Sequence, residues 1–374
     1  TPTYGRSGSG DPSHKSNAVT PPVGGTMTDI ITIDGSKGEG GGQMLRTSLS
    51  VAAVAGQPVR LINIRAGRAK PGLAAQHLTS CRAVAEVCGG KLAGAEIGSQ
   101  QVELHPGPVT GGEYHFDIGT AGSTSLLLQA VLPPLLFAAS PSHLVLHGGT
   151  DVPWSPIFHY LDEVFLPTVR QMGVSARLEC RRHGWYPAGG GEVQAWIEPL
   201  QGPLQALQWT QRGETTGAVA HSLVSEKLPM HIAQRQCQGL QEALGKCLAL
   251  PCEQHHEPSH SHGTTCFAAV RFASGAGGFT SLGERGKPAE QVGVETGEAL
   301  QAFLNLEATV DERLADQLLL YAILAQGRSA YLSPRLTGHL ETNAWVIEQL
   351  LHVGTEFEYT STGTLVEVQG LGLS

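Results

Sequence analysis

The chain has 374 residues, a formal net charge of -9, and a composition of 41% hydrophobic and 15% charged residues. This length allows two or three domains with a sizeable core, and the composition is ordinary for a folded protein. The negative charge argues against non-specific coating of nucleic acid but leaves room for a local basic site. The 48 glycines follow no triplet period, which excludes collagen, and no apolar run is long enough to span a bilayer.

The first 27 residues are polar and rich in Ser, Gly and Pro, and they lack the apolar segment of a signal peptide. We expect a disordered leader or extension here, with the fold beginning near residue 28. The seven cysteines along the chain form no Cys-x-x-Cys pair. A disulfide framework or a four-cysteine zinc site is therefore not expected, and reduced thiols in a cytoplasmic protein fit better.

One order of elements recurs three times from residue 28 onward. A strand, a helix, a short apolar strand, a second helix and two further strands follow one another. Two copies fall within residues 28–208 and the third within residues 308–374. Each unit would pack two helices on one face of a small sheet, and three units could bury their helices against one another. The sequence therefore predicts an α/β (α+β) fold built from three repeated βαβαββ units.

Residues 209–307 interrupt the third copy with their own strand, helix, three strands and helix. We interpret this segment as an inserted α/β domain. Its run HHEPSHSH, from His255 to His262, is the metal-like cluster of the sequence. The run has no helical i, i+4 pair and no cysteine partner, so a solvated loop explains it better than a structural metal.

The segment KGEGGGQMLR, residues 37–46, places three consecutive glycines before an amphipathic helix. Taken alone, it is a strand-to-helix turn that needs permissive dihedral angles. Between Lys37 and Arg82, however, seven basic residues accompany a single acid, Glu39. This asymmetry would suit a phosphate-bearing ligand, although a solvated basic edge would also explain it. Glu39 could bind a hard cation such as Mg²⁺, or it could form a salt bridge with Arg46 or Lys37.

Further polar candidates follow in chain order. Arg65 and Arg68 lie on a predicted turn, and Gln76 and His77 open the next helix. Two guanidinium groups can hold one phosphate through several charge-assisted hydrogen bonds. These residues therefore add to the case for an anionic ligand.

Two segments near the end of the chain carry candidate nucleotide chemistry. RLTGHLETN places His339 near a helix start, where backbone N–H groups and the helix dipole favour anions. His339 could be a nucleophile toward phosphorus, a general base, or a polar residue at a helix start. DERLADQ places Asp316 and Gln317 early in another helix. Asp316 could bind the base or ribose of a nucleotide, or it could orient a histidine.

Seven segments together resemble the RNA 3'-terminal phosphate cyclase family, in order over nearly all of residues 28–374: IDGSKGEGGGQMLR, IRAGRAKPGLAAQHL, GTAGSTSLLLQAVLP, LHGGTDVPWSPIF, YPAGGGEV, LADQLLLYAILA and GHLETN. The resemblance implies an enzyme that uses ATP and Mg²⁺ (or Mn²⁺) to convert an RNA 3'-terminal phosphate to a 2',3'-cyclic phosphate. It also implies a fold of three repeats resembling the C-terminal domain of a translation initiation factor, plus an inserted thioredoxin-like domain.

The resemblance also implies residue roles. His339 falls on the histidine that becomes covalently attached to AMP, and Glu39 falls on a metal-binding glutamate. Positions that contact the adenine nucleotide match Gln129, Pro156, Asp316 and Gln317. Polar positions near phosphates match Arg46, Arg65, Arg68, Gln76 and His77. Arg313 stands where relatives commonly have tyrosine, so it could stack through its guanidinium plane or bind a phosphate instead.

Two other hypotheses share parts of this pattern. A non-catalytic relative that works in ribosome assembly would have the same fold but would lack the nucleophilic histidine, which is present here as His339. An enolpyruvyl-type transferase of similar repeat architecture would also place arginines around phosphates. It would have no use for a nucleotide-linked histidine.

Overall fold

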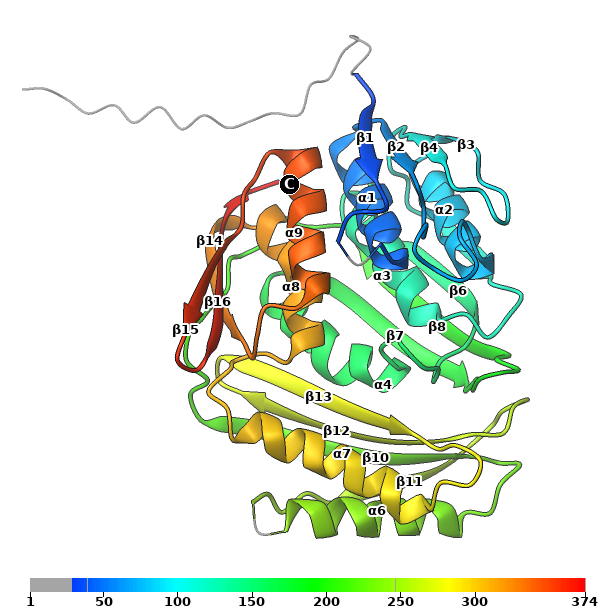
Figure 1. Ribbon diagram of the computed structural model, residues 1–374, viewed down its shortest axis with the longest axis vertical. Coiled ribbons are helices and arrows are strands. Elements are labelled where there is room, and N and C mark those ends of the chain that lie inside the picture. The colour runs from blue at the N-terminus through cyan, green and yellow to red at the C-terminus, as the bar shows by residue number, and fades with distance from the viewer. Residues whose placement is uncertain (1–28, 39, 246, 374) are drawn as a thin grey trace, which may run out of the picture.

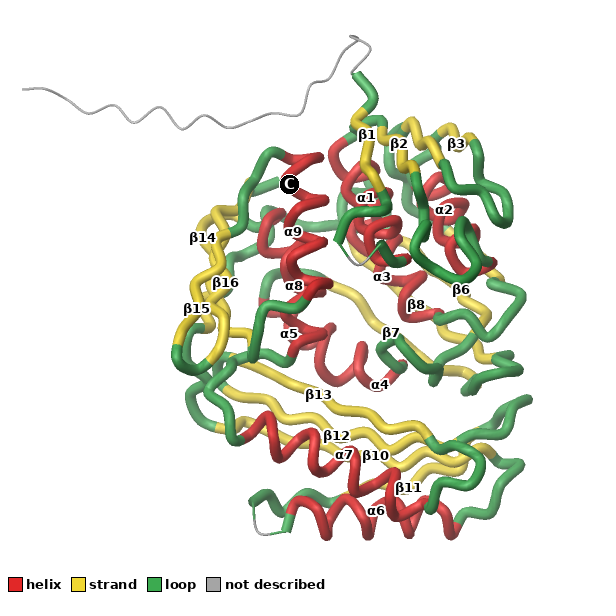
Figure 2. Tube along the Cα trace, viewed as in Figure 1, coloured by secondary structure: helices red, strands yellow, loops and turns green. Residues whose placement is uncertain are grey.

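The computed structural model describes residues 29–38, 40–245 and 247–373. The leader expected at residues 1–27 and the metal ligand expected at Glu39 lie outside the described residues. The described chain is a mixed α/β fold with four four-stranded sheets and helices packed between and beneath them (Figures 1 and 2).

The first sheet lies at the amino-terminal end of the described chain. Its strands, in spatial order, are β1 (Ile31–Asp34), β2 (Val59–Ile62), β4 (Val102–His105) and β3 (Lys91–Ala93). Its helices are α1 (Gly42–Ala55) and α2 (Ala75–Val87). Because β1 and β2 run parallel, the chain needs a crossover between them, and α1 supplies it. The helix expected directly after the glycine turn is thereby confirmed.

The second and third sheets repeat this strand order. The second contains β5 (Glu113–Asp117), β6 (Ser142–Gly148), β8 (Gly191–Glu198) and β7 (Ser175–Arg182). The third contains β9 (Gln208–Trp209), β14 (Gln326–Ser333), β16 (Gly363–Leu371) and β15 (Glu356–Thr360). In each, the first strand in this order pairs in parallel with the second, and the second pairs antiparallel with the third.

The helices that belong to these two sheets supply much of the central core. They are α3 (Thr124–Leu135), α4 (Phe158–Tyr160), the π-helical segment η1 (Leu161–Phe165), α5 (Leu166–Gln171), α8 (Glu312–Leu324) and α9 (Gly338–Leu351). Helix α3 is apolar on nearly every side and is almost wholly buried, and it contains both Pro133 and Pro134. Figure 1 shows α1, α3, α8 and α9 gathered in the middle of the molecule. None of the described helices is both long and apolar enough to cross a membrane.

The fourth sheet lies at the end of the molecule remote from β1 (Figure 1). Its strands, in spatial order, are β11 (Cys252–Glu257), β10 (Thr215–Ser225), β12 (Thr264–Phe272) and β13 (Gly275–Leu282). Helices α6 (His231–Leu244) and α7 (Ala289–Leu304) pack together against one face of this sheet. Leu240, Val270 and Leu300 belong to a separate hydrophobic core in this part of the chain.

A buried carboxylate joins the fourth sheet to the central helices. Asp311 caps the start of α8 by accepting hydrogen bonds from the backbone N–H groups of Arg313 and Leu314, at 2.8 and 3.0 Å. It also accepts hydrogen bonds from the Gly278 backbone N–H of β13 at 3.0 Å and from the Tyr160 hydroxyl at 2.9 Å. Burial raises the pKa of Asp311 above its ordinary value. These donors replace the water that the carboxylate gives up on burial.

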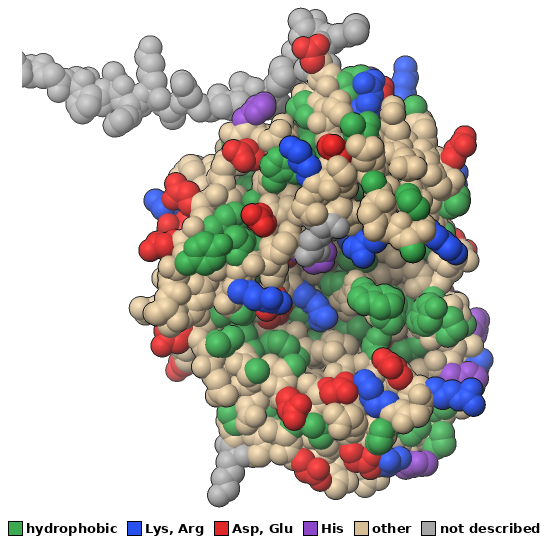
Figure 3. All heavy atoms as spheres, viewed as in Figure 1, with side chains coloured by type: hydrophobic (Ala, Val, Ile, Leu, Met, Phe, Trp, Pro, Cys, Tyr) green, Lys and Arg blue, Asp and Glu red, His purple; other side chains and the backbone are tan. Residues whose placement is uncertain are grey.

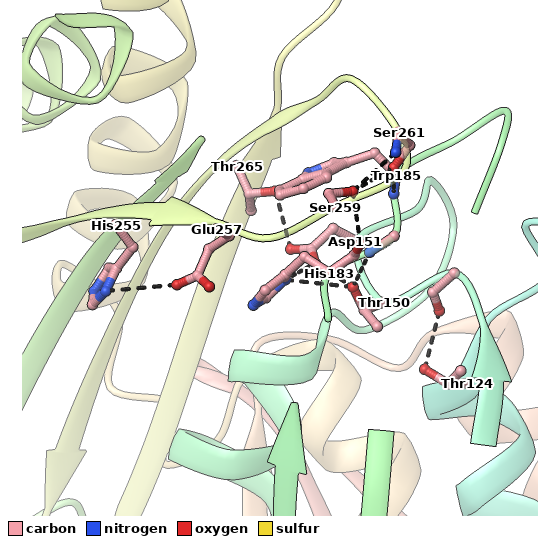
Figure 4. A network of polar contacts seen from close by, with 12 residues as sticks. Thr124, Thr150, Asp151, His183, Trp185, His255, Glu257, Ser259, Ser261 and Thr265 are labelled. Carbon is pink, nitrogen blue, oxygen red and sulfur yellow. Dashed lines mark hydrogen bonds and ion pairs between the residues drawn. The ribbon is translucent and has the colours of Figure 1, made fainter. Parts of the chain in front are cut away.

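A second group of buried polar contacts joins Asp151 and His183 to β12 and to the segment after β11 (Figure 4). His183 Nδ1 lies 2.7 Å from Asp151 Oδ2, and the Thr265 hydroxyl donates to Asp151 Oδ1 at 3.0 Å. The buried Ser259 hydroxyl donates to the His183 carbonyl at 2.7 Å. The solvated loop expected at 255–262 is therefore wrong in part. The segment begins inside β11, and Ser259 points into the protein, where it bonds His183, the residue that follows β7.

The expectation that every cysteine is a reduced thiol is also wrong. Cys237 of α6 and Cys252 of β11 form a disulfide, with their Cα atoms 5.5 Å apart. The remaining cysteines are free: Cys81, Cys88, Cys180, Cys247 and Cys266. A separation of 15 residues without a sequence motif gave no sign of this bond. It depends on the packing of α6 against β11, which is a tertiary contact.

Close packing of α6 and α7 generates a stability prediction. A Cβ atom added at Gly293 would lie 1.9 Å from the Gln236 backbone oxygen, so the two helices would have to separate. We expect Gly293→Ala to lower the free energy of unfolding by about 1–3 kcal/mol, although Ala is the better helix former. Urea unfolding measures this change. Gly202→Ala is the matched control, because a Cβ there meets no atom within 4 Å, and equal losses in both variants would contradict the prediction.

Candidate active site

A cavity of about 750 Å³ lies where α1, α8 and α9 meet α3 and the turn before α4. Figure 3 shows this face of the molecule hollowed near its middle, with basic side chains around the hollow. The predicted site residues that line the cavity are Arg46, Arg65, Arg68, Gln76, His77, Gln129, Pro156, Arg313, Asp316, Gln317 and His339. The structure thus brings together every predicted site residue that it describes.

The glycine turn allows side chains to approach the start of α1 closely. Gly41 precedes α1 in an extended conformation, and Gly42 is the first helical residue. A Cβ atom at Gly42 would lie 2.3 Å from His77 Nε2 and 3.0 Å from an Arg46 guanidinium nitrogen. Only glycine leaves room for both groups beside the first turn, where backbone N–H groups have no partner within the helix.

His77 is held as a neutral donor. The Ala74 backbone N–H donates to His77 Nδ1 at 3.3 Å, so in the neutral ring the proton is on Nε2. Burial, followed by the charges of Arg46 and Arg65, lowers the pKa of His77 to about 3. At neutral pH the ring is therefore uncharged, and its Nε2–H lies beside Gly42, where it can donate to an anion.

Positive charge dominates the cavity. Its guanidinium groups belong to Arg46, Arg65, Arg68 and Arg313, and the single carboxylate in the described lining is that of Asp316. Burial lowers the pKa of Arg46 to about 10, while the charge of Asp316 acts in the opposite direction, so Arg46 remains charged at neutral pH. Arg65 donates from Nη1 to the Gly72 carbonyl at 2.7 Å, which fixes its position at the wall. This excess of cations suits an anionic ligand.

The basic run found in the sequence does not enter the cavity as a whole. Arg60 forms an ion pair with Glu103 at 2.8 Å, and the Lys37 ammonium lies 4.9 Å from the centre of the Trp345 ring. These two residues belong to the structural part of the run. The interpretation as a solvated basic edge therefore applies to part of this segment. Arg46, Arg65 and Arg68, which line the cavity, fit the alternative of a phosphate-bearing ligand.

Amide side chains from two helices hold Asp316 in place. Gln43 of α1 donates from Nε2 to both of its carboxylate oxygens, and Asn343 of α9 donates to Oδ1 at 2.6 Å. The Thr47 hydroxyl in turn donates to Asn343 Oδ1 at 2.7 Å. Gln43 and Asn343 were not among the residues predicted from the sequence. Their positions, beside the glycine run and in GHLETN, were the available signals.

His339 lies at the start of α9, as expected. Gly338 is the first residue of the helix, and the Thr337 hydroxyl caps it by accepting from the Leu340 backbone N–H at 3.1 Å. The His339 side chain lines the cavity, and Asn343 follows one turn later on the same face of the helix. The contact between Asn343 and Asp316 therefore also orients the part of α9 that carries His339.

Several buried polar atoms of the lining have no hydrogen-bond partner among the described residues. They are Gln129 Nε2, Gln317 Oε1, Ser50 Oγ and the Tyr321 hydroxyl. Buried polar groups are normally paired, so an unpaired set in one cavity indicates a place for the complementary groups of a ligand. At the rim, Trp154 is 95% exposed, and it too was not predicted from the sequence.

A protein with a mixed α/β fold and an arginine-lined cavity that gathers a histidine, amides and one carboxylate is suited to bind a phosphate-bearing ligand. The sequence model for RNA 3'-terminal phosphate cyclase matches residues 37–357. The RNA 3'-terminal phosphate cyclase of Methylococcus capsulatus is 44% identical over 350 residues, a match covering 91% of this chain and 97% of that protein. That of Pyrobaculum neutrophilum is 40% identical over 349 residues, covering 91% and 99%. The chain therefore belongs to the RNA 3'-terminal phosphate cyclase family.

Among solved structures, the enolpyruvyl transferase NikO from Streptomyces tendae matches 46% of this chain and 33% of its own, at 16% identity and a TM-score of 0.27. This likeness is too weak to support a conclusion about the fold or the site.

The glycine turn generates a prediction about activity. Gly42→Ala would displace His77 and Arg46, and we expect a loss of cyclase activity on the order of 100-fold, because small displacements in an active site have large effects on rate. Folding should persist, because the displaced atoms are the ends of side chains. Gly41→Ala is the control, since its Cβ would lie 3.6 Å from Arg68 in ordinary contact. Activity assays with circular dichroism distinguish the variants. A fully active Gly42→Ala variant would show that the close approach of His77 and Arg46 to residue 42 is not needed for activity.

Proposed function

We propose that the protein converts an RNA 3'-terminal phosphate to a 2',3'-cyclic phosphate at the expense of ATP, through a covalent bond between His339 and AMP. The observation that carries this proposal is the meeting of His339 with four guanidinium groups and unpaired amide groups in one cavity, in a chain of the cyclase family. A histidine nucleophile suits nucleotidyl transfer, because imidazole is both a good nucleophile and a good leaving group.

Three chemical steps follow from this assignment. First, a neutral His339 nitrogen attacks the α-phosphorus of ATP, forming a P–N bond while the P–O bond to pyrophosphate breaks. Second, an oxygen of the RNA 3'-phosphate attacks the same phosphorus and releases His339, which leaves a terminal anhydride. Third, the neighbouring ribose 2'-hydroxyl attacks the RNA phosphorus, loses its proton and expels AMP. The 2'-hydroxyl already lies on the adjacent carbon, so the last step is intramolecular.

The nucleotide is assigned to the part of the cavity formed by α3 and α8. Gln129 Nε2 and Gln317 Oε1 offer an unpaired donor and an unpaired acceptor, which complement the edge of an adenine ring. Arg313 would stack on the base through its guanidinium plane, in place of the tyrosine common in relatives. Asp316, fixed by two amides, would contact the ribose, and Pro156 would pack against the nucleotide.

The phosphates are assigned to the part of the cavity beside the glycine turn. Arg46, Arg68 and the Nε2–H of His77 gather there, and Arg65 and Gln76 complete its wall. A divalent cation, Mg²⁺ or Mn²⁺, would neutralise phosphate charge when bound. Its proposed carboxylate ligand is Glu39. Trp154 at the rim would stack on an unpaired RNA base, as exposed aromatic side chains do in single-strand binding.

We also propose that the architecture is three repeats, at residues 28–208 and 308–374, with residues 209–307 inserted into the third. The shared strand order of three sheets supports this division. The pairing of β9 with β14 also supports it, because β9 precedes and β14 follows all the strands of the fourth sheet in the sequence. Likeness of the repeats to an initiation-factor domain and of the insert to thioredoxin remains a prediction. A cytoplasmic location also remains a prediction. It was based on reduced thiols, and the Cys237–Cys252 disulfide counts against that basis, because disulfides are rare in the cytosol.

Labelling with α-labelled ATP in the absence of RNA tests the histidine directly. His339 is exposed at the start of α9, so His339→Ala should keep the fold while abolishing both the acid-labile adduct and cyclisation. His352→Asn is the control, because it changes a histidine at the other end of the same helix, and Asn tolerates the left-handed conformation there. A labelled His339→Ala protein would place the nucleophile elsewhere. Wild-type protein that acquires no label would favour the ribosome-assembly or enolpyruvyl hypothesis.

The division of the cavity predicts that Arg68→Ala separates two steps. Removing one charge-assisted contact to the RNA phosphate should lower cyclisation by roughly 10- to 100-fold. Self-adenylylation should fall much less, because we assign Arg65 and Arg68 to the RNA 3'-phosphate rather than to ATP, since they lie far along the chain from the helices that carry Asp316 and His339. Lys70→Ala is the matched control, since Lys70 lies on the same exposed loop but does not line the cavity. Equal losses in adenylylation and cyclisation would assign Arg68 to ATP instead.

A further inference from the structure

A cluster of possible metal ligands lies on the fourth sheet, outside the cavity. His221 belongs to β10, and Glu253 and His255 belong to the neighbouring edge strand β11. The strands run parallel with His221 opposite Glu253. Residues two apart on a strand share a face, so all three side chains project from the same face of the sheet. Among the described residues, this is the group whose ligand atoms all lie within 4.8 Å of one another.

The distances between these ligand atoms match a metal site. His221 Nδ1 lies 3.1 Å from His255 Nε2, and Glu253 Oε2 lies 3.6 Å from each of these two nitrogens. In tetrahedral zinc coordination, bonds of about 2.0–2.1 Å separate the ligand atoms by roughly 3.4 Å. The three atoms therefore already form a nearly equilateral triangle of the required size.

Hydrogen bonding within the protein does not account for this arrangement. One imidazole can donate to the other across 3.1 Å, but Glu253 Oε2 is too far from either nitrogen for a hydrogen bond. The second ring nitrogen of each histidine also faces a carboxylate. His255 Nδ1 lies 3.8 Å from Glu257 Oε1 (Figure 4), and His221 Nε2 lies 3.9 Å from Glu163 Oε1. Both distances are too long for hydrogen bonds, so these two carboxylates lie near the rings without fixing their orientation.

We propose that His221, Glu253 and His255 bind one Zn²⁺ ion, with water in the fourth position. Two imidazoles and a carboxylate suit zinc, whereas Mg²⁺ and Ca²⁺ prefer oxygen ligands alone. The Glu253 side chain is 69% exposed, which leaves the fourth position open to solvent. None of these three residues lines the cavity, so the proposed zinc site stands or fails independently of the proposed function.

The ion would hold the edge strand β11 on one face of the sheet, while the disulfide holds the same strand on the other face. Cys252 directly precedes Glu253, and its side chain is tied to α6 by the disulfide on the opposite face of the sheet. Strand β11 pairs only with β10 among the described strands, because it lies at the edge of the sheet. A metal bridging β10 and β11 would therefore stabilise a strand that has one neighbour.

The test uses the full chain, stripped with a chelator and then titrated with Zn²⁺ against a chromophoric competitor. We expect one Zn²⁺ per chain by elemental analysis, and a rise in melting temperature with zinc. Glu253→Gln and His255→Gln should each weaken zinc affinity by about tenfold or more. Co²⁺ in place of zinc should give the visible absorption typical of tetrahedral coordination in the wild-type chain and not in these variants.

His256→Gln is the matched control. His256 is the next residue on the same strand, it faces the other side, and its Nε2 lies 3.0 Å from the Leu228 carbonyl. This variant should bind zinc as the wild type does. Glu253→Gln alters an exposed side chain, so circular dichroism should report an unchanged fold. A wild-type chain without stoichiometric zinc, or equal affinity in all the variants and the wild type, would overturn the proposal.

Discussion

The cavity depends on the hydrogen bonds that the Asp316 carboxylate accepts from side-chain amides of two other helices. Gln43 and Asn343 bring α1 and α9 to α8 at this point. On α1, Arg46 follows Gln43 within one turn, and on α9 Asn343 follows His339 within one turn, so each amide shares a face with a residue of the site. Fixing the amides therefore also fixes the guanidinium group and the histidine. A partly buried polar group of this kind is stable only when its partners are all in place.

The electrostatics of the cavity differ from those of the whole chain. The protein carries a net charge of -9, yet the described lining holds four guanidinium groups and one carboxylate. The single carboxylate is already bonded to amides, so it offsets the nearby cations only in part. His77 remains neutral because burial and the neighbouring arginines oppose its protonation. The cavity thus combines fixed positive charge with neutral donors, and an anionic ligand supplies what it lacks.

The fourth sheet is joined to the rest by polar contacts of a similar kind. Asp311 links β13 to the start of α8, and the pair of Asp151 with His183 meets Thr265 on β12. These carboxylates are buried, and each is supplied with donors from segments that are distant in the chain. The sheet is therefore held to the central helices by directional bonds, so its orientation relative to the cavity is well defined.

Local features of this protein could be predicted from the sequence alone. Hydrophobic periodicity located the helices that became α1, α8 and α9, and the glycine run marked the turn before α1, because backbone sterics and side-chain spacing act within a few residues. The position of His339 behind Gly338 at a helix start followed from the same local chemistry. The resemblance to a family then indicated which distant segments would share one site, which spacing could not do.

Tertiary structure decided how those segments meet. Gln43 and Asp316 are 273 positions apart, and no local pattern relates them. The disulfide between Cys237 and Cys252 and the approach of His221 to His255 likewise depend on how a helix or a strand packs beside β11. A sequence specifies the residues that can form such contacts. Only the packing of helices and sheets in three dimensions selects the pairs that do, because each contact requires a distance and an orientation that chain spacing leaves open.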